Sequence, residues 1–341
     1  MKTQLIKIDI DDPEQGLVDE AGKLLREGQL VAIPTETVYG LAANALDAKA
    51  VCSIFTAKGR PQDNPLIVHI ADNDGLAPLV KSLPPKAEAL AQAFWPGPLT
   101  IILPRADVVP AVVSAGLDTV AIRMPSHSVA RAIIRSAGVP LAAPSANRSG
   151  SPSPTTAGHV MQDMDGIIPL IVDAGACGVG VESTVVSMVS DTPVILRPGA
   201  VTKEQLERVI GTVMIDSGVL HRVSDTVKAS SPGMKYKHYA PRAKVYMVEG
   251  DSDAYCDYVN SKPDAFALCF EEDIPKLKVN YVNYGSQDDA SSQARLLFTS
   301  LRELDRLGAA TVYARAPQKT GVGLAVYNRL IRAAGFDIIK L

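Results

Sequence analysis

The 341-residue sequence predicts an α/β fold divided into two domains. The length exceeds the usual size of one domain, so each half can bury a core of its own. Hydrophobic residues make up 47% of the chain and charged residues 21%, a balance typical of a globular protein. Short apolar runs alternate with amphipathic segments in both halves. This rhythm predicts a large sheet in the N-terminal half and a smaller, mostly parallel sheet in the C-terminal half.

The N-terminal half begins with an amphipathic helix over residues 14–27, which Gly28 ends because glycine easily adopts a left-handed conformation. A second helix begins at Ser126, a good N-cap, and stops at Gly138. A third covers residues 203–210. Apolar runs predict buried strands at residues 30–34, 65–71, 100–104, 119–124, 141–143, 167–172 and 184–188.

Residues 216–242 are predicted to link the two domains, because the segment is polar, locally basic and contains Ser, Gly and Pro. The predicted domains therefore span residues 1–215 and 243–341. The second domain contains predicted strands at 244–248, 266–270, 279–284 and 311–316, and helices at 252–260, 290–307 and 324–334. This alternation is typical of a Rossmann-like α/β/α arrangement.

Composition excludes several classes of protein. The net charge of -3 provides no overall basic field for nucleic acid, so any RNA contact must use a local patch. The four cysteines lack a CxxC pair, which argues against a zinc site or a disulfide framework. No apolar run approaches the roughly 20 residues of a membrane helix, and charges interrupt the N-terminal segment. We therefore expect a cytoplasmic protein.

Polar segments at the ends of the predicted strands form a candidate anion-binding site. Two cations, Lys58 and Arg60, precede a strand that contains His69, and such cations suit phosphate. The loop at 144–154 is rich in hydroxyl and backbone donors. Arg123 and Arg197 each end a strand-like run. Taken singly, these features also fit a solvated turn, a core histidine, a surface loop and exposed strand ends.

The known motifs for phosphate binding and hydrolysis do not occur in the sequence. The glycines in GACGVGVEST (residues 175–184) have the spacing GxxGxG, which differs from the dinucleotide-binding fingerprint. There is no GxxxxGK[ST] loop, no HExxH helix and no GxSxG nucleophile elbow. A nucleotide would have to be held in another way.

Seven segments in chain order resemble the Sua5/YrdC family. They are PTETVYGLA (34–42), KGRPQDNPL (58–66), WPGPLT (95–100), AIRMP (121–125), PSANRSGSPSPT (144–155), ESTVV (182–186) and LRPG (196–199). The resemblance covers about residues 10–212. A further segment, SPGMKYKHYAP (231–241), is similar to the linker of the long Sua5 subgroup.

The resemblance implies a YrdC-like N-terminal domain with a large twisted mixed sheet and flanking helices, followed by the smaller Rossmann-like domain. It implies a reaction in which L-threonine, bicarbonate or CO2, and ATP give threonylcarbamoyl-adenylate and pyrophosphate. The substrates supply both nucleophile and leaving group, so no protein nucleophile is needed. Alignment and charge stabilisation would remain for the protein, and Mg²⁺ would arrive with ATP rather than in a protein cage. A tRNA threonylcarbamoyl transferase would use the product downstream.

The resemblance also assigns the site residues. Those expected to contact ATP are Lys58, Arg60, Asn64, Thr119, Ser145, Ser153, Arg197 and Tyr239. Those expected to hold threonine are Thr37, His69, Arg123, Ala143 and Ser183, with Arg123 pairing the carboxylate. The linker is expected to cover the ATP site, with Tyr239 at the nucleotide and Lys235, Lys237 or His238 near the phosphates.

Two functions of other classes compete with this prediction. Basic residues in and beside the linker favour an RNA-binding module without catalysis, but the negative net charge and the lack of an RNP-type motif oppose it. These residues are Lys228, Lys235, Lys237, His238, Arg242 and Lys244. A regulatory or docking protein is disfavoured by the intact polar motifs. Direct RNA binding is expected to be weak or absent.

Overall fold

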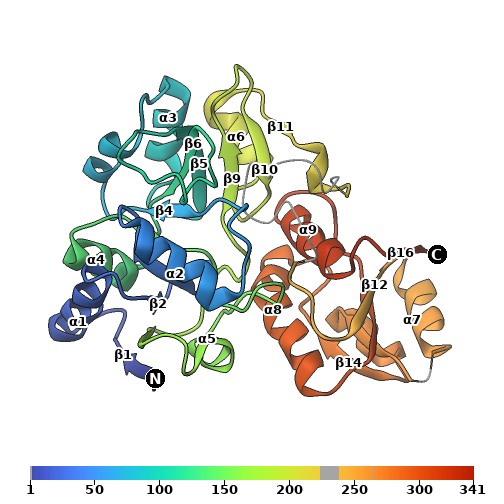
Figure 1. The fold of residues 1–341 in the computed structure, drawn as a ribbon. Coiled ribbons are helices and arrows are strands. Elements are labelled where there is room, and N and C mark those ends of the chain that lie inside the picture. Colours follow the sequence, from blue (N-terminus) through green and yellow to red (C-terminus); the bar gives the residue numbers. More distant parts are fainter. Residues whose placement is uncertain (1, 223–237, 263) are drawn as a thin grey trace.

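The computed structural model describes residues 2–222, 238–262 and 264–341. Within these residues the chain forms two α/β units, each with helices on both faces of a sheet (Figure 1). The N-terminal sheet is mixed and has eleven strands in the order β1-β8-β2-β3-β7-β4-β6-β5-β9-β10-β11. The C-terminal sheet has five strands in the order β14-β13-β15-β12-β16, and its pairings are all parallel. The predicted α/β architecture is confirmed.

The elements of the N-terminal unit have the following bounds. Its strands are β1 (Gln4–Lys7), β2 (Val31–Ile33), β3 (Gly40–Asn44), β4 (Ile67–His69), β5 (Leu99–Pro104), β6 (Thr119–Arg123), β7 (Leu141–Ala142), β8 (Leu170–Asp173), β9 (Thr184–Ser187), β10 (Val194–Arg197) and β11 (Met214–Ile215). Its helices are α1 (Gln15–Arg26), α2 (Ala48–Lys58), α3 (Pro85–Phe94), α4 (Ser128–Ala137), α5 (Ala157–Met164) and α6 (Lys203–Ile210).

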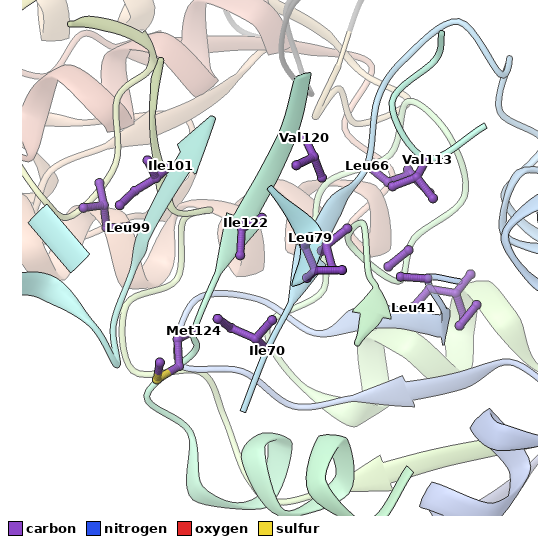
Figure 2. Close-up of a cluster of buried hydrophobic side chains, with 14 of the residues drawn as sticks. Leu41, Leu66, Ile70, Leu79, Leu99, Ile101, Val113, Val120, Ile122 and Met124 are labelled. Atoms are coloured by element: carbon purple, nitrogen blue, oxygen red, sulfur yellow. The ribbon is translucent and has the colours of Figure 1, made fainter. Parts of the chain in front are cut away.

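Two hydrophobic cores lie on opposite faces of the large sheet. Because successive strand residues point to opposite faces, Val31 and Ile33 enter the core beneath α1 and α4, whereas Ala32 enters the other core. That second core is covered by α2, α3, α5 and α6. Figure 2 shows part of it, including Ile101 and Ile122 on the neighbouring strands β5 and β6. Both faces are dry, which explains why these strands are apolar almost throughout.

The C-terminal unit follows the same plan with fewer strands. Its strands are β12 (Lys244–Glu249), β13 (Phe266–Cys269), β14 (Asn280–Asn283), β15 (Thr311–Arg315) and β16 (Ile338–Lys340), and its helices are α7 (Ser252–Asn260), α8 (Ala290–Arg306) and α9 (Gly323–Ala333). One core lies under α7 and another under α8 and α9. The second of these cores also contains Val38 and Val181 of the N-terminal unit, so the two units share a packed boundary (Figure 1).

Several local expectations need correction. Helix α4 begins at Ser128 after His127, so Ser126 is not its N-cap. Lys58 is the last residue of α2 rather than part of a loop. Strands β1, β3, β11 and β16 and helices α2, α3 and α5 were not expected. The strands among them are short and the helices weakly amphipathic, so their tertiary neighbours decide their structure.

The predicted linker is described only in part. Its first residues form a 3₁₀ turn, Ser217–Val219, in which Gly218 and Val219 are buried. The domain boundaries at 215 and 243 stay a prediction, with β11 ending at Ile215 and β12 beginning at Lys244. In the described part of the chain, no helix is both long and apolar enough to cross a membrane.

Candidate functional site

A polar cavity lies in the N-terminal unit beside the boundary between the units, since two residues that line it, Val38 and Tyr239, also belong to the core under α8 and α9. It holds about 700 Å³ of empty space, a figure that includes its open mouth. Ten of the thirteen predicted site residues line it: Thr37, Lys58, Arg60, His69, Arg123, Ala143, Ser145, Ser183, Arg197 and Tyr239. The fold therefore brings together segments that are separated by as many as two hundred residues of sequence.

One side of the cavity is formed by the ends of two adjacent strands. Parallel strands β4 and β6 pair His69 with Arg123 in register, which places both side chains on the same face. The Nη1 group of Arg123 donates to Thr37 Oγ1 at 2.9 Å. Burial, together with the charge of Arg123, lowers the pKa of His69 to about 3, so the imidazole is neutral at physiological pH.

Arg123 already has an internal carboxylate partner. Its Nη2 lies 2.7 Å from Glu36 Oε1, and both side chains are largely buried. The sequence analysis missed Glu36 because its partner is 87 positions away along the chain. Arg123 is the predicted partner of a substrate carboxylate. Its guanidinium is oriented by Glu36 at Nη2 and by Thr37 at Nη1.

Lys58 holds the loop that follows β7. Its Nζ donates to Ser145 O at 2.5 Å and to Asn147 O at 2.6 Å, so the end of α2 fixes this wall of the cavity. Ser145 Oγ in turn donates to Asn147 Oδ1 at 2.6 Å. Burial, reinforced by the charge of Arg60, lowers the pKa of Lys58 well below its usual range.

Two further arginines face the cavity without a carboxylate within ion-pair distance among the described residues. Arg60 Nη2 reaches Asn64 O at 3.5 Å, and its Nε has no hydrogen-bond partner there. Arg197, at the end of β10, donates to Ser183 O at 3.0 Å and to Ser183 Oγ at 3.1 Å. Burial lowers the pKa of each guanidinium to about 10, which leaves both charged at neutral pH.

Hydrogen bonds fix two further residues that line the cavity, Ser183 and Ala143. Ser183 Oγ lies 2.8 Å from Thr100 Oγ1, and Ser183 immediately precedes β9. Ala143 lines the cavity beside β7, with its backbone N–H donated to Ile67 O at 3.0 Å. These contacts fix Ser183 and Ala143 before any ligand binds.

Three predicted site residues do not line the cavity. Asn64 is buried, and its backbone carbonyl accepts from Arg60 Nη2. Thr119 is the first residue of β6, opposite Pro104 on β5. Ser153 is fully buried and donates to Glu182 Oε1 at 2.5 Å. Asn64 and Ser153 lie behind the wall, because each contacts a residue that lines the cavity without lining it itself. Sequence motifs do not distinguish residues that line a cavity from residues that lie behind its wall.

The described end of the predicted cover lies against the cavity. His238 and Tyr239 both line it, and Ala240 N donates to Gly150 O at 2.9 Å. Tyr239 is buried and has a φ of 64°, a left-handed conformation that costs a non-glycine residue about 1–3 kcal/mol. Lys228, Lys235 and Lys237 lie outside the described residues.

Glu182 and Asn147 also line the cavity, although the sequence analysis gave them no role. Both lie inside segments that carried the resemblance, so a closer reading of those segments could have found them. Groups of three or more His, Cys, Asp or Glu side chains suited to a metal ion are absent from residues 2–222, 238–262 and 264–341. Glu182, the carboxylate that faces the cavity, is already bound to Ser153 and Arg329.

Together these features define a two-domain α/β protein with a cationic ligand cavity at the domain boundary. Comparisons with known proteins agree. A family model for Sua5, YciO and YrdC, described as telomere recombination, matches residues 23–199. A second model, described as the C-terminal domain of threonylcarbamoyl-AMP synthase, matches residues 201–335.

Relatives match over the whole chain. A Pyrococcus abyssi protein named threonylcarbamoyl-AMP synthase is 48% identical over 337 residues, which covers 96% of this chain and 97% of that protein. A Bacillus subtilis protein of the same name is 47% identical, with 100% of each chain covered. The crystal structure of P. abyssi Sua5 complexed with L-threonine has a TM-score of 0.91 at 45% identity, covering 99% of this chain and 100% of that one. The chain belongs to the Sua5/YrdC family, in its two-domain Sua5 form.

Proposed function

We propose that this protein is a threonylcarbamoyl-AMP synthase, a nucleotidyltransferase that makes threonylcarbamoyl-adenylate and pyrophosphate from L-threonine, bicarbonate or CO2, and ATP. The product would serve threonylcarbamoyladenosine modification of tRNA through a downstream transferase. The names of the full-length relatives and the threonine-bound Sua5 structure support this assignment. The observation that carries it is the cavity itself, in which Arg60, Arg123 and Arg197 converge.

The charges in the cavity suit a polyphosphate. Arg60 and Arg197 have lowered pKa values because burial disfavours their charge, and neither forms an ion pair among the described residues. An anionic ligand would relieve this desolvation cost and would be held by charge-assisted hydrogen bonds. Lys58, Ser145 and Tyr239 lie on the same side, so we assign this side to ATP. Asn64 and Ser153 would support it from behind the wall.

The opposite side suits an amino acid. Arg123, which already pairs with Glu36, would share its planar guanidinium with the substrate carboxylate. Neutral His69, Thr37 and Ser183 offer hydrogen-bonding groups to an amine or hydroxyl. Because threonine carbamate would supply the attacking oxygen, the protein would align this oxygen with the α-phosphorus and stabilise phosphate charge. Mg²⁺ would enter as part of the substrate complex with ATP.

The RNA-binding alternative gains little support. Of its predicted basic residues, His238 lines the cavity, Arg242 Nε lies 3.8 Å from Asp305 Oδ1, and Lys244 Nζ lies 3.7 Å from Asp337 Oδ2. Arg242 and Lys244 thus each have a carboxylate beside them.

The first prediction tests the reaction and the ATP side together. Pyrophosphate release should require threonine and bicarbonate as well as ATP, and Arg60→Ala should raise the KM for ATP about 10-fold or more, since a hydrogen bond to a charged group contributes about 1.5–3 kcal/mol. Arg26→Ala, an exposed arginine outside the cavity, is the matched control.

Release that is independent of threonine would refute the proposed reaction. Tight RNA binding with a steep salt dependence, and no pyrophosphate release, would favour the RNA-binding module instead.

A further inference from the structure

Glu182 is held from the C-terminal unit. This glutamate lines the cavity and precedes Ser183, yet its carboxylate is bound by Arg329 of α9. Arg329 Nε donates to Glu182 Oε2 at 2.7 Å and its Nη2 to Glu182 O at 3.4 Å. Arg329 is completely buried and Glu182 is 7% exposed. Such a desolvated pair fixes geometry strongly, because each partner would otherwise be a buried, unpaired charge.

The pair continues into the cavity wall on one side. The other carboxylate oxygen of Glu182 accepts from Ser153 Oγ at 2.5 Å, in the donor-rich loop. The next residue, Ser183, accepts the Arg197 guanidinium on its carbonyl and side chain. Burial raises the pKa of Glu182, but the charges of Arg329 and Arg197 outweigh it and the pKa lies below its usual value. The charged Glu182 carboxylate thus links Arg329 of the C-terminal unit to Ser153 in the donor-rich loop, and we call this link the bracket.

On its other side, the pair continues into the polypeptide that connects the two units. Arg329 Nη1 donates to Asn328 Oδ1, and Asn328 Nδ2 donates to Val219 O at 2.7 Å. The guanidinium also lies 5.7 Å from the ring centre of Tyr239, which packs against the ring of Phe298 of α8 at 5.3 Å. Arg329 therefore contacts both the Glu182 carboxylate and Tyr239, which lines the cavity.

We propose that Arg329 is a positioning residue for ATP binding, which makes the C-terminal unit a structural part of the reactive site. Arg329 holds Glu182, Glu182 accepts from Ser153, and the same guanidinium lies against the ring of Tyr239. This inference rests on the proposed function for the identity of the ligand. The geometry of the chain of contacts is independent of it.

The test separates positioning from a merely structural role by comparing stability with ATP affinity. In the full-length chain, Arg329→Met leaves Glu182 buried and unpaired, so both the melting temperature and the affinity for ATP should fall, the latter at least tenfold. In Arg329→Met/Glu182→Gln the unpaired charge is gone. Its melting temperature should recover, while its ATP affinity should stay low because the bracket is still missing. Arg329→Lys, which keeps the charge but loses the fork, should lie between wild type and Arg329→Met.

ATP affinity is measured by calorimetry without threonine, and kcat and KM by pyrophosphate release. Thr299→Val is the matched control, since it removes another contact across the boundary, Thr299 Oγ1 to Thr155 Oγ1 at 3.2 Å, and should bind ATP normally. Wild-type ATP affinity in Arg329→Met or in the double variant would overturn the inference. A wild-type chain that binds ATP but releases no pyrophosphate would refute the proposed reaction without affecting the role of Arg329.

Discussion

Arg197 and Arg315 occupy equivalent places in the two units, since each is a buried arginine at the last position of a strand. Their surroundings differ. Arg197 faces a cavity and donates to a serine, whereas Arg315 Nη1 lies 2.6 Å from Asp273 Oδ1 in a closed cluster. The rings of Tyr255 and Phe270 lie 5.4 and 5.6 Å from the Arg315 guanidinium.

This difference indicates two uses of the same side chain. Asp273 also accepts from Ser252 Oγ at 2.7 Å and from Phe270 N at 3.1 Å, so the charge of Arg315 is compensated inside the fold. The charge of Arg197 is compensated only in part, by the nearby Glu182, so a ligand can compensate the rest. Both sheets present the carboxyl ends of strands, but only the chemistry around those ends makes a binding site.

The largest expected effect is on activity, at Arg197. Arg197→Met should lower kcat/KM for ATP by about 10²-fold, the effect typical of losing a preorganised group that stabilises transition-state charge. Its stability without ligand should change by less than about 1 kcal/mol, because removing a poorly compensated buried cation also removes its desolvation cost. Pyrophosphate release and thermal unfolding measure the two quantities. A large loss of stability in Arg197→Met would contradict the proposed difference between Arg197 and Arg315.

The reverse result is expected at Arg315. Arg315→Met should destabilise the protein by about 3–5 kcal/mol, because it leaves the buried Asp273 without its charged partner. Activity per folded molecule should be close to wild type at a temperature well below the transition. Arg315→Met/Asp273→Asn should regain much of the stability. An active-site defect in the folded variant would mean that the C-terminal cluster also serves the reaction.

A smaller effect is expected on the protonation of Lys58 when ATP binds. The pKa of Lys58 is depressed by burial and by Arg60, and a polyphosphate nearby would favour the charged ammonium and raise that pKa again. ATP binding at an alkaline pH at which Lys58 is partly neutral should therefore be accompanied by proton uptake. Calorimetry in Tris and in HEPES should give binding enthalpies that differ in the direction of uptake. Lys58→Met should reduce this difference, and proton release by the wild type would contradict the assignment.

Much of the fold could be predicted because local sequence carries it. Helices α6 and α7 have the predicted bounds, Lys203–Ile210 and Ser252–Asn260, since an N-cap residue and an apolar stripe define them locally. Strand β3 was missed because its residues, Gly40–Asn44, have no clear strand signal and depend on pairing with β2 and β7. The same reason applies to the two-residue strand β11.

The sequence by itself determined which chemical groups are available: the cations, the hydroxyl-rich loop and the seven ordered segments, seven of whose assigned residues line one cavity. Only the tertiary structure decided their partners. Glu182 and Arg329 are 147 positions apart, and nothing local connects them. Gly180 is similar, because a Cβ there would lie 2.3 Å from the Arg295 backbone of α8, so this glycine permits the units to approach. Sequence patterns report conformational preference over a few residues, whereas charge compensation and close approach depend on which distant segments meet.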